Sequence, residues 1–317
     1  MFHLSLKRVK PTTRLLLVVA LLASLTLAAS ADEGGVSFWL PGQYGSFAAT
    51  PPPQGFSLTM MTYQYSGRAG GTLGRGGDRL TVGLDADALG QFIVPTYTSE
   101  TKILGGTPSF NMAIAPMGSR ADVDLAFGPL AGSRSDSVTG LADLYPTAQL
   151  YWNKGVHNWM AYGTGNIPIG SYEKNRLVNI GLGHASIDVG GAYTYLNPES
   201  GWEFSATAGL TYNFENPHTD YQNGLDSHLD VGVAKFLNEK FYIGGVGYAY
   251  QQLTADSGQA PFLGDNESRV FGVGPQIGYM FGSQERPVFT NLKAYFEFGA
   301  ERRTQGTGAF LTVNAPF

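Results

Sequence analysis

The sequence predicts an all-β protein, a transmembrane antiparallel up-and-down β-barrel of about twelve strands. Segments in which apolar and polar residues alternate recur along the chain, as expected of strands with lipid on one face and water on the other. After residue 31 no stretch offers the roughly 18 uninterrupted apolar residues that a spanning helix needs. The predicted connections are alternately short and long, which is typical of such barrels and has no reason to occur in a soluble sandwich.

Residues 1–31 have the order of a secretory signal peptide. Four basic residues between positions 7 and 14 precede an apolar run over 15–27, and the small residues Ala29, Ser30 and Ala31 follow. The run is shorter than the roughly 20 residues of a spanning helix, so we expect cleavage near Ala31 and export. An exported chain without a spanning helix can cross a membrane only as a closed sheet, because lipid tolerates no unpaired backbone.

Composition excludes several classes of function. Removal of the signal leaves 16 basic against 25 acidic residues, a net charge of −9, and this acidic chain shows no basic patch. We therefore expect no nucleic-acid partner. The chain has no cysteine, which excludes disulfides and thiolate chemistry. The mean hydropathy of −0.08 suits barrel strands, which place only every second side chain in lipid.

Residues 32–55 form a segment of their own before the first predicted strand. Phe38, Trp39, Leu40 and Tyr44 make it apolar, and the prolines at 51–53 disfavour a central strand. Two interpretations stay open: a disordered periplasmic tail, or a segment folded into the lumen as a plug. The plug would place Phe38, Trp39 and Tyr44 on the path of a solute.

Residues 56–317 are predicted to form the barrel. The clearest strand covers 202–214, where large apolar residues alternate with a set that contains no large apolar side chain. The predicted external loops are the longer connections, at 66–88, 128–142, 169–186, 215–224 and 255–268. The twelve predicted strands lie at 56–65, 89–103, 108–127, 143–152, 158–168, 187–196, 202–214, 225–236, 241–254, 269–281, 291–301 and 308–317.

The last strand alternates in the same way and stops on the aromatic Phe317. This ending resembles the final strand of bacterial outer-membrane barrels, where it is the assembly signal. It predicts location in the bacterial outer membrane. The expected partners are outer-membrane lipid and the barrel assembly machinery.

Polar residues on the predicted strands should point into the lumen, because charge facing lipid is costly. Asp226, His228 and Asp230 share one face, which allows a structural network with basic partners across the lumen, contact with a solute, or a metal or catalytic dyad. Lys293 and Glu297 share a face in the same way and are further candidates for the solute path.

The remaining candidates lie in the predicted loops or at the ends of the predicted strands beside them. Gln252 and Asp256 could hydrogen-bond a solute hydroxyl, and Tyr221 could either cap its loop or line the entrance. Arg269 and Arg303 are candidates for ion pairs at the rim or in the loops.

Motifs of enzymes are absent from the sequence. It contains no Gly-x-Ser-x-Gly, no His-Glu-x-x-His and no phosphate-binding Gly-rich loop followed by lysine. No two histidines have metal-ligand spacing on one strand. We therefore expect no catalysis, no cofactor and no metal.

Several short motifs resemble a known family. They are the proline-rich opening at 51–55, the stretch 219–224 with His228 and Asp230 after it, the stretch 251–258, Arg269-Val270 with Gly274-Pro275, and 303–306. In order and spacing they resemble the family named for the meta-pathway of phenol degradation, outer-membrane transport proteins encoded near genes for aromatic catabolism. The opening departs from that family's Pro-Pro-Gly pattern, because Gln54 precedes Gly55. The resemblance implies a barrel that admits aromatic or other hydrophobic compounds.

The function expected from these features is passive uptake of small aromatic or hydrophobic solutes across the outer membrane. Twelve strands leave a narrow lumen, which favours a constricted path over a wide pore. Two alternatives from other classes are an outer-membrane hydrolase or acyl-modifying enzyme, and a structural or adhesive barrel.

Overall fold

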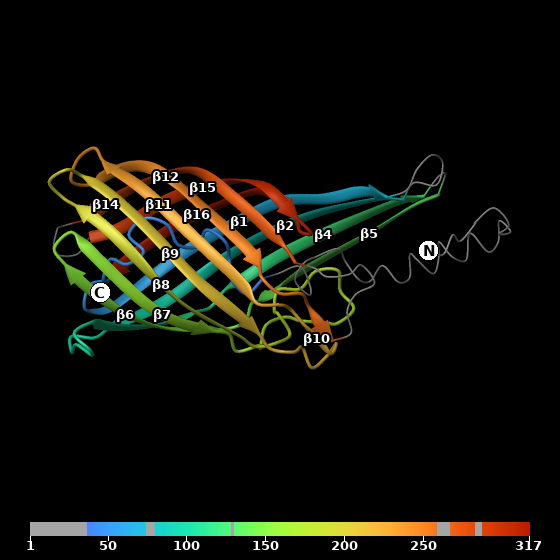
Figure 1. Cartoon of the computed structure of the whole chain (residues 1–317), viewed down its shortest axis with the longest axis horizontal. Helices are drawn as coiled ribbons and strands as arrows, with labels where there is room; N and C mark the ends of the chain where they lie inside the picture. The colour runs from blue at the N-terminus through green and yellow to red at the C-terminus, as the bar shows by residue number, and fades with distance from the viewer. Residues whose placement is uncertain (1–36, 74–79, 128–129, 259–266, 283–286) are drawn as a thin grey trace.

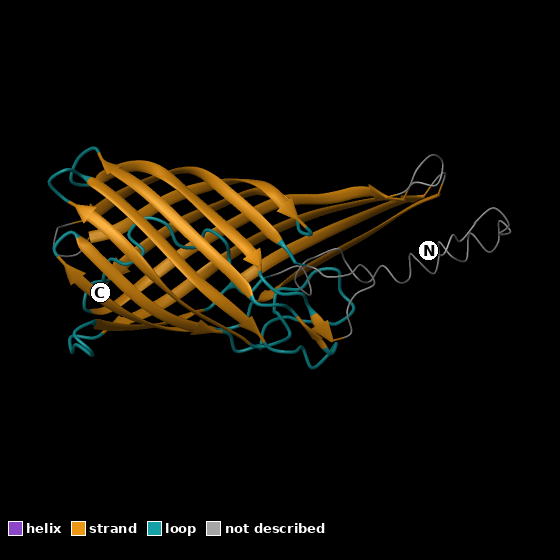
Figure 2. Cartoon of the chain, in the orientation of Figure 1, coloured by secondary structure: helices purple, strands orange, loops and turns teal. Residues whose placement is uncertain are grey.

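The computed structural model describes residues 37–73, 80–127, 130–258, 267–282 and 287–317, so the predicted signal segment 1–31 lies outside it. Strands and loops make up all of these residues (Figure 2). None of the described residues belongs to a helix long and apolar enough to cross a membrane. The strands are β1 (Gly55–Leu73), β2 (Leu80–Thr98), β3 (Thr107–Ala113), β4 (Pro116–Phe127), β5 (Leu130–Leu141), β6 (Tyr145–Lys154), β7 (His157–Gly165), β8 (Ser186–Asn197), β9 (Trp202–Asn213), β10 (Tyr221–Gln222), β11 (Asp226–Phe236), β12 (Phe241–Gln252), β13 (Ser257–Gly258), β14 (Arg269–Gly282), β15 (Pro287–Glu301) and β16 (Gln305–Pro316).

Fourteen of these strands form one sheet, which closes into a barrel because β1 pairs with both β16 and β2 (Figure 1). All the pairings are antiparallel. Strand β2 pairs with β3 near one end and with β4 along the rest, so β3 and β4 are one interrupted wall strand. Likewise β5 pairs with β4 and β6 pairs with β3, so β5 and β6 together form a second interrupted wall strand. Among the described residues the wall therefore has twelve strands, and the predicted fold class is confirmed.

The alternation of side chains sets the two faces of the wall. On β9, Phe204 is 45% exposed while the neighbouring Glu203 is 1% exposed. The outer face carries large apolar side chains around the barrel, including Leu229, Ile243 and Leu311. A soluble surface rarely presents so large an apolar belt, so this face lies against lipid.

Four strands continue beyond this belt as an extension, defined as the parts of β1, β2, β4 and β5 that project at the long-loop end of the barrel (Figure 1). On the outer face of β1, Leu58 and Met60 give way to Ser66 and Arg68. Opposite them on β2, Leu89 is followed in the direction of the extension by Asp87. Because charged residues replace apolar ones on the outer face, the extension lies outside the lipid.

The sequence prediction of loops at 66–88 and 128–142 was therefore wrong. Most of these residues are paired strands, with Gly70 opposite Gly83 and Asp122 opposite Ser135. The alternation used to recognise strands depends on an apolar face in contact with lipid, and it stops where the strands leave the membrane. Backbone pairing continues without it.

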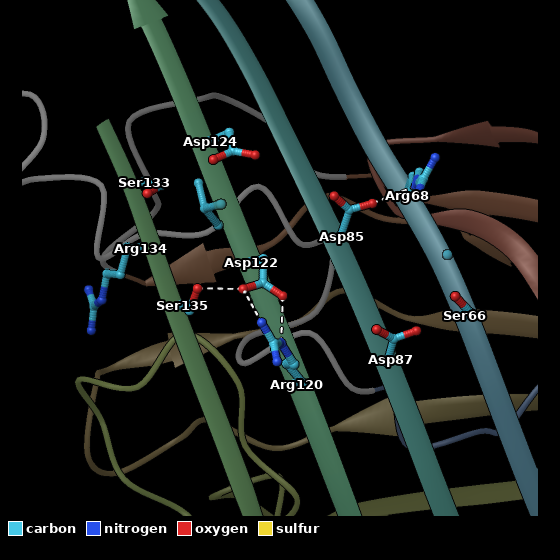
Figure 3. Close-up of a pocket in the computed structure, with 12 residues that line it drawn as sticks. Ser66, Arg68, Asp85, Asp87, Arg120, Asp122, Asp124, Ser133, Arg134 and Ser135 are labelled. Atoms are coloured by element: carbon cyan, nitrogen blue, oxygen red, sulfur yellow. Dashed lines mark hydrogen bonds and ion pairs between the residues drawn. The ribbon is translucent and has the colours of Figure 1, made fainter. Parts of the chain in front are cut away.

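The outer face of the extension holds a shallow polar groove (Figure 3). Arg68 pairs with Asp85 at 2.6 Å, and Arg120 donates to both carboxylate oxygens of Asp122 at 2.7 and 3.0 Å. The hydrogen bonds from Arg120 and then from Ser135 lower the pKa of Asp122 to about 2. These exposed groups satisfy one another in water.

Side chains fill the barrel interior at two levels. The first apolar cluster surrounds Trp39 and includes Tyr162, Tyr248 and Tyr295 from the wall. The second joins the inner face of the extension to the β7–β8 loop (residues 166–185), through Leu84 and Val138 on the strands and through Leu177, Val178 and Ile180 on the loop.

Candidate functional site

The N-terminal segment, described here from residue 37 to residue 54, lies against the inner face of the wall (Figure 1). The ring of Trp39 stacks on His228, with 3.4 Å between ring centroids and 12° between planes. Tyr44 and Tyr162 stack against the same indole, at 5.7 and 6.0 Å. Trp39 is thus enclosed by aromatic rings from its own segment and from two strands.

The turn around Gly42 is held by two charged side chains of the wall. The Nζ of Lys293 on β15 donates to the carbonyl oxygens of Gly42, Gln43 and Tyr44, at 2.6, 2.8 and 2.7 Å. The carboxylate of Asp230 on β11 accepts from the amides of Gly42 and Tyr44, at 2.9 and 3.2 Å. Lysine thus satisfies the carbonyls and aspartate the amides of one turn, which leaves little buried backbone unpaired.

Glycine is required at this turn for two reasons. Gly42 has a φ of +80°, a conformation that strains residues with a side chain. A Cβ at this position would also lie 2.7 Å from the ring of Tyr295.

The segment is anchored again four to seven residues further on. The amide of Phe47 donates to Glu203 at 2.8 Å, and the amide of Ala49 donates to Thr194 at 2.9 Å. Gln276 donates to the hydroxyl of Ser46 at 2.7 Å. These anchors, with Asp230 and Lys293, come from β8, β9, β11, β14 and β15, which is one side of the barrel.

On the opposite side the segment leaves a cavity of about 330 Å³ between itself and the wall. None of the described residues that line it is acidic, basic or histidine. Its lining comes from the segment, from the facing strands β1, β2, β3, β4, β6, β7 and β16, and from the β7–β8 loop: Ser37, Phe38, Trp39, Leu40, Gln43, Tyr44, Pro52, Ser57, Thr59, Met61, Phe92, Val94, Thr96, Asn111, Ala113, Met117, Tyr145, Thr147, Gln149, Tyr151, Thr164, Ile180 and Asn314.

Carboxamides supply polar groups on one wall of this cavity. Gln149 on β6 donates to the hydroxyl of Tyr44 at 3.1 Å and accepts from Asn111 on β3 at 3.2 Å. Burial raises the pKa of Tyr44 to about 12, so its hydroxyl stays protonated at neutral pH. Asn314 is tied to Thr59 at 2.7 Å. The cavity therefore combines an apolar, aromatic lining with a few oriented hydrogen-bonding groups, as small-molecule sites do.

The β7–β8 loop covers the cavity through Ile180 and attaches to β5. Arg134 donates to the carbonyl of Asn175 at 2.9 Å, and the carboxylate of Asp136 accepts from the amide of Leu177 at 3.0 Å. Among the described strands, β5 pairs with β4 alone. The β7–β8 loop therefore lies on the side of β5 where a second neighbouring strand would otherwise pair.

Asp143 holds the two ends of the same loop together. Its carboxylate is buried and accepts from Asn166, from the amide of Gly170 and from the amide of Leu182, at 2.7, 2.8 and 3.2 Å. One carboxylate therefore fixes the shape of the loop over the cavity.

Three of the solute-path candidates named from sequence line the cavity: Phe38, Trp39 and Tyr44. His228 and Lys293 lie on the other side of the segment and hold it. Glu297 accepts from the hydroxyls of Tyr65 and Tyr248, at 2.8 and 2.6 Å, and from an amide of β16 at 2.7 Å.

Tyr221, Gln252 and Asp256 lie at the long-loop end and contact one another. Asp256 accepts from the hydroxyl of Tyr221, from Gln252 at 2.6 Å and from the amide of Gly224 at 2.9 Å. None of the three lines the cavity. They join the connection between β12 and β14, which contains β13, to the connection between β9 and β11, which contains β10.

The two arginine candidates lie near this end of the barrel. Arg269 forms an ion pair with Glu301 at 2.6 Å between β14 and β15. The guanidinium carbon of Arg303 lies 4.7 Å from the ring centroid of Tyr250.

The face shared by Asp226, His228 and Asp230 is buried, and its partners differ from those expected. Asp226 binds Asn213 at 2.8 Å, and His228 binds Asp188 at 3.0 Å. The expectation of basic partners across the lumen overlooked the backbone of the N-terminal segment, which supplies the amides for Asp230. Among the described residues no group of three or more His, Asp or Glu side chains is arranged to hold a metal ion.

Sequence reasoning missed the wall side of the cavity. Met61, Phe92, Tyr145 and Gln149 lie on four different stretches that alternation alone cannot bring together. The signal that was available in the sequence is a large apolar side chain at an inward position of a predicted strand, as at Met61 and Phe92.

Solved structures of outer-membrane barrels are similar to this chain. One is an outer-membrane channel from Pseudomonas putida F1, with 12% identity, a TM-score of 0.59, and coverage of 86% of this chain and 98% of the other. Another is a FadL homologue from Pseudomonas aeruginosa, with 9% identity, a TM-score of 0.46, and coverage of 82% and 89%. The first of these similarities supports the fold. No curated protein matches the sequence.

The sequence model of one family matches residues 70–313, which include most of the barrel wall and the cavity-facing strands β2, β3, β4, β6 and β7. Its description, "Putative MetA-pathway of phenol degradation", agrees with the resemblance given by the short motifs. The chain belongs to this family.

Proposed function

We propose that this protein is a passive outer-membrane channel for small aromatic or hydrophobic solutes, and that residues 32–55 act as its plug. The observation that carries the proposal is the uncharged, aromatic-lined cavity inside a barrel whose outer face is apolar. A solute in this cavity contacts Phe38, Trp39 and Tyr44 of the plug and the wall opposite.

Two comparisons support the channel. The similar structure from P. putida is described as an outer-membrane channel, and the description of the family refers to phenol degradation. Both agree with uptake of a small aromatic compound.

The way in which the plug is held supports its role. Its backbone amides donate long-range hydrogen bonds to Asp230 and Glu203, and its carbonyls accept from Lys293, contacts that a disordered tail would not make. These contacts all lie on one side, so the segment narrows the lumen and leaves the cavity as the remaining space.

The location follows from the same proposal. The signal peptide 1–31 is cleaved near Ala31, the barrel assembly machinery recognises Phe317, and the apolar belt lies in outer-membrane lipid. Arg269 and Arg303 fix strands and loops at the external end.

We propose no catalysis. The pair of Asp188 and His228, with Tyr162 at 3.2 Å from the histidine, is the arrangement most similar to an active site. Both side chains of the pair are fully buried, and the ring of Trp39 covers the imidazole. A substrate could reach them only by displacing the plug.

The test is uptake of labelled aromatic compounds into proteoliposomes that contain the purified protein. Neutral aromatics should enter proteoliposomes that contain the wild-type protein faster than they enter protein-free liposomes. They should also enter these proteoliposomes faster than aromatic anions do. Removal of residues 32–49 should raise single-channel conductance in planar bilayers and reduce this selectivity. Solute entry no faster than in protein-free liposomes would refute the channel, whereas unchanged conductance in a folded deletion variant would refute only the plug.

A further inference from the structure

The interior of the barrel is divided by charge. On the anchored side of the N-terminal segment lie Asp188, Glu203, Asp230 and Lys293, all buried. The cavity side carries none of these groups and no other ionised side chain among its described lining residues. A solute in the cavity therefore meets apolar surface and neutral dipoles, and an ion there would lose its hydration without gaining a counter-charge.

Gln149 contacts two other neutral polar residues of the cavity lining, Asn111 and Tyr44. Its carbonyl accepts from Asn111, and its amide nitrogen donates to Tyr44 at 3.1 Å and to the sulfur of Met160 at 3.6 Å. A carboxamide has two N–H donors, and a thioether sulfur is a weak acceptor. The hydrogen that points toward Met160 can therefore exchange its weak acceptor for an oxygen at little cost.

Asn111 adds a second donor beside it. One hydrogen of its amide nitrogen bonds to Gln149, and the same amide carries a further hydrogen. Gln149 and Asn111 come from paired strands, β6 and β3, so both amides project from one patch of wall.

The rest of the cavity suits an apolar body. Met61, Phe92 and Met117 come from β1, β2 and β4, and Tyr145 and Ile180 add to the apolar lining. The volume of about 330 Å³ is at the small end of the range of about 300–1,000 Å³ usual for ligand pockets. A single small ring fits these dimensions better than a long chain.

We propose that Gln149, positioned by Asn111, determines which solutes the cavity accepts: small neutral molecules with one hydrogen-bond-accepting oxygen on an apolar ring. The inference rests on the proposed channel function and adds the residue that selects. The oxygen binds the amide of Gln149 while the ring lies against Phe92, Met61 and Met117. Pure hydrocarbons cannot form this hydrogen bond. Anions would lose their hydration in the cavity without gaining a counter-charge.

The experiment compares the permeability of the full-length protein in proteoliposomes to three solutes of similar size. Benzyl alcohol carries one oxygen, ethylbenzene carries none, and benzoate carries a negative charge. A net hydrogen bond of this kind corresponds to a preference of a few-fold to about tenfold for the alcohol over the hydrocarbon. Wild-type protein should show that preference and admit benzoate slowest.

Gln149→Leu, which keeps the approximate size of the side chain, should abolish the preference for benzyl alcohol over ethylbenzene. Gln91→Leu, on the outer face of β2, is the matched control and should leave the ratio unchanged.

Equilibrium binding of labelled benzyl alcohol to the same variants in detergent gives a second measurement that is independent of flux. Affinity should fall for Gln149→Leu and not for Gln91→Leu. If wild-type protein admits all three solutes and Gln149→Leu leaves both the ratio and the affinity unchanged, the assignment of Gln149 is overturned. If wild-type protein admits none of them, the proposed channel function itself fails.

Discussion

The indole of Trp39 lies parallel to the imidazole of His228 at a centroid distance of 3.4 Å. Trp39 belongs to a segment that precedes the barrel, and His228 is the third residue of β11. Behind the imidazole, Asp188 binds its Nε2 at 3.0 Å and fixes the ring that receives the indole. This contact joins the proposed plug to the wall at the level of the cavity.

Trp39→Ala should therefore loosen the plug without unfolding the barrel. Removing a buried tryptophan from a packed core costs about 3–5 kcal/mol of stability. Here the substitution should weaken the binding of the N-terminal segment to the wall and leave the stability of the barrel unchanged. Single-channel conductance should rise or become noisier, while the heat-modifiable mobility of the barrel stays unchanged. Trp159→Ala, on the outer face of β7, is the control, and equal conductance in both variants would contradict the prediction.

Cysteine labelling can test the two faces of the wall, because the chain has no native cysteine. Thr207 and Thr211 on the inner face of β9 are fully buried in the presence of the N-terminal segment. Thr207→Cys should therefore react slowly with a water-soluble thiol reagent in the full-length protein and quickly after removal of residues 32–49. Phe204→Cys, which faces lipid, should be shielded in both backgrounds. Labelling of Thr207→Cys at the same rate with and without the segment would show that the segment does not cover β9.

A cross-link can test whether the β7–β8 loop must move for uptake. A Cβ placed on Gly140 of β5 would lie 3.0 Å from the Cβ of Ser171 on the loop. Disulfides need about 3.5–4.5 Å, so a shift of a few tenths of an ångström allows the bond. The double variant Gly140→Cys/Ser171→Cys should lose solute uptake when oxidised and recover it on reduction.

The single variants Gly140→Cys and Ser171→Cys control for the substitutions themselves. Each should respond to neither oxidant nor reductant. Full uptake through a double variant that is completely cross-linked would mean that the solute does not pass this loop.

Phe317 should matter for assembly and not for the stability of the finished barrel. Its side chain is 70% exposed, and its backbone amide closes the last strand onto Phe56 at 2.9 Å. Phe317→Ala keeps this hydrogen bond and loses little packing, so protein refolded in detergent should unfold at the wild-type temperature. In cells the same variant should accumulate less in the outer membrane. If Phe317→Ala lowered the melting temperature as much as a core substitution does, the prediction would be wrong and Phe317 would contribute to packing in the finished barrel.

The barrel and its two faces were determined by the sequence alone. Along 202–214 each large apolar side chain is followed by a small or polar one, and only a closed wall between lipid and a polar interior satisfies that pattern over twelve strands. Facing is a local property, since the side-chain period of a strand is two residues. It can therefore be predicted without knowledge of the neighbouring strands.

The extension was decided by tertiary structure. Along Gly67, Ala69 and Gly71 the side chains are too small to mark a face, yet each residue pairs with a partner on β2. These residues are held in strands by backbone hydrogen bonds to the neighbouring strand. The composition of one strand does not reveal whether such a neighbour is present.

The cavity and the binding of the plug also depended on tertiary structure. Phe38, Trp39 and Tyr44 were recognisable as an apolar cluster that needs burial, but the sequence left open whether the lumen receives them. Lys293 binds carbonyls about 250 positions away in the chain, and Gln149 meets Tyr44 across 105 positions. Such contacts arise only when the closed barrel brings distant strands around one small volume, because no local periodicity records which inward side chains will share it.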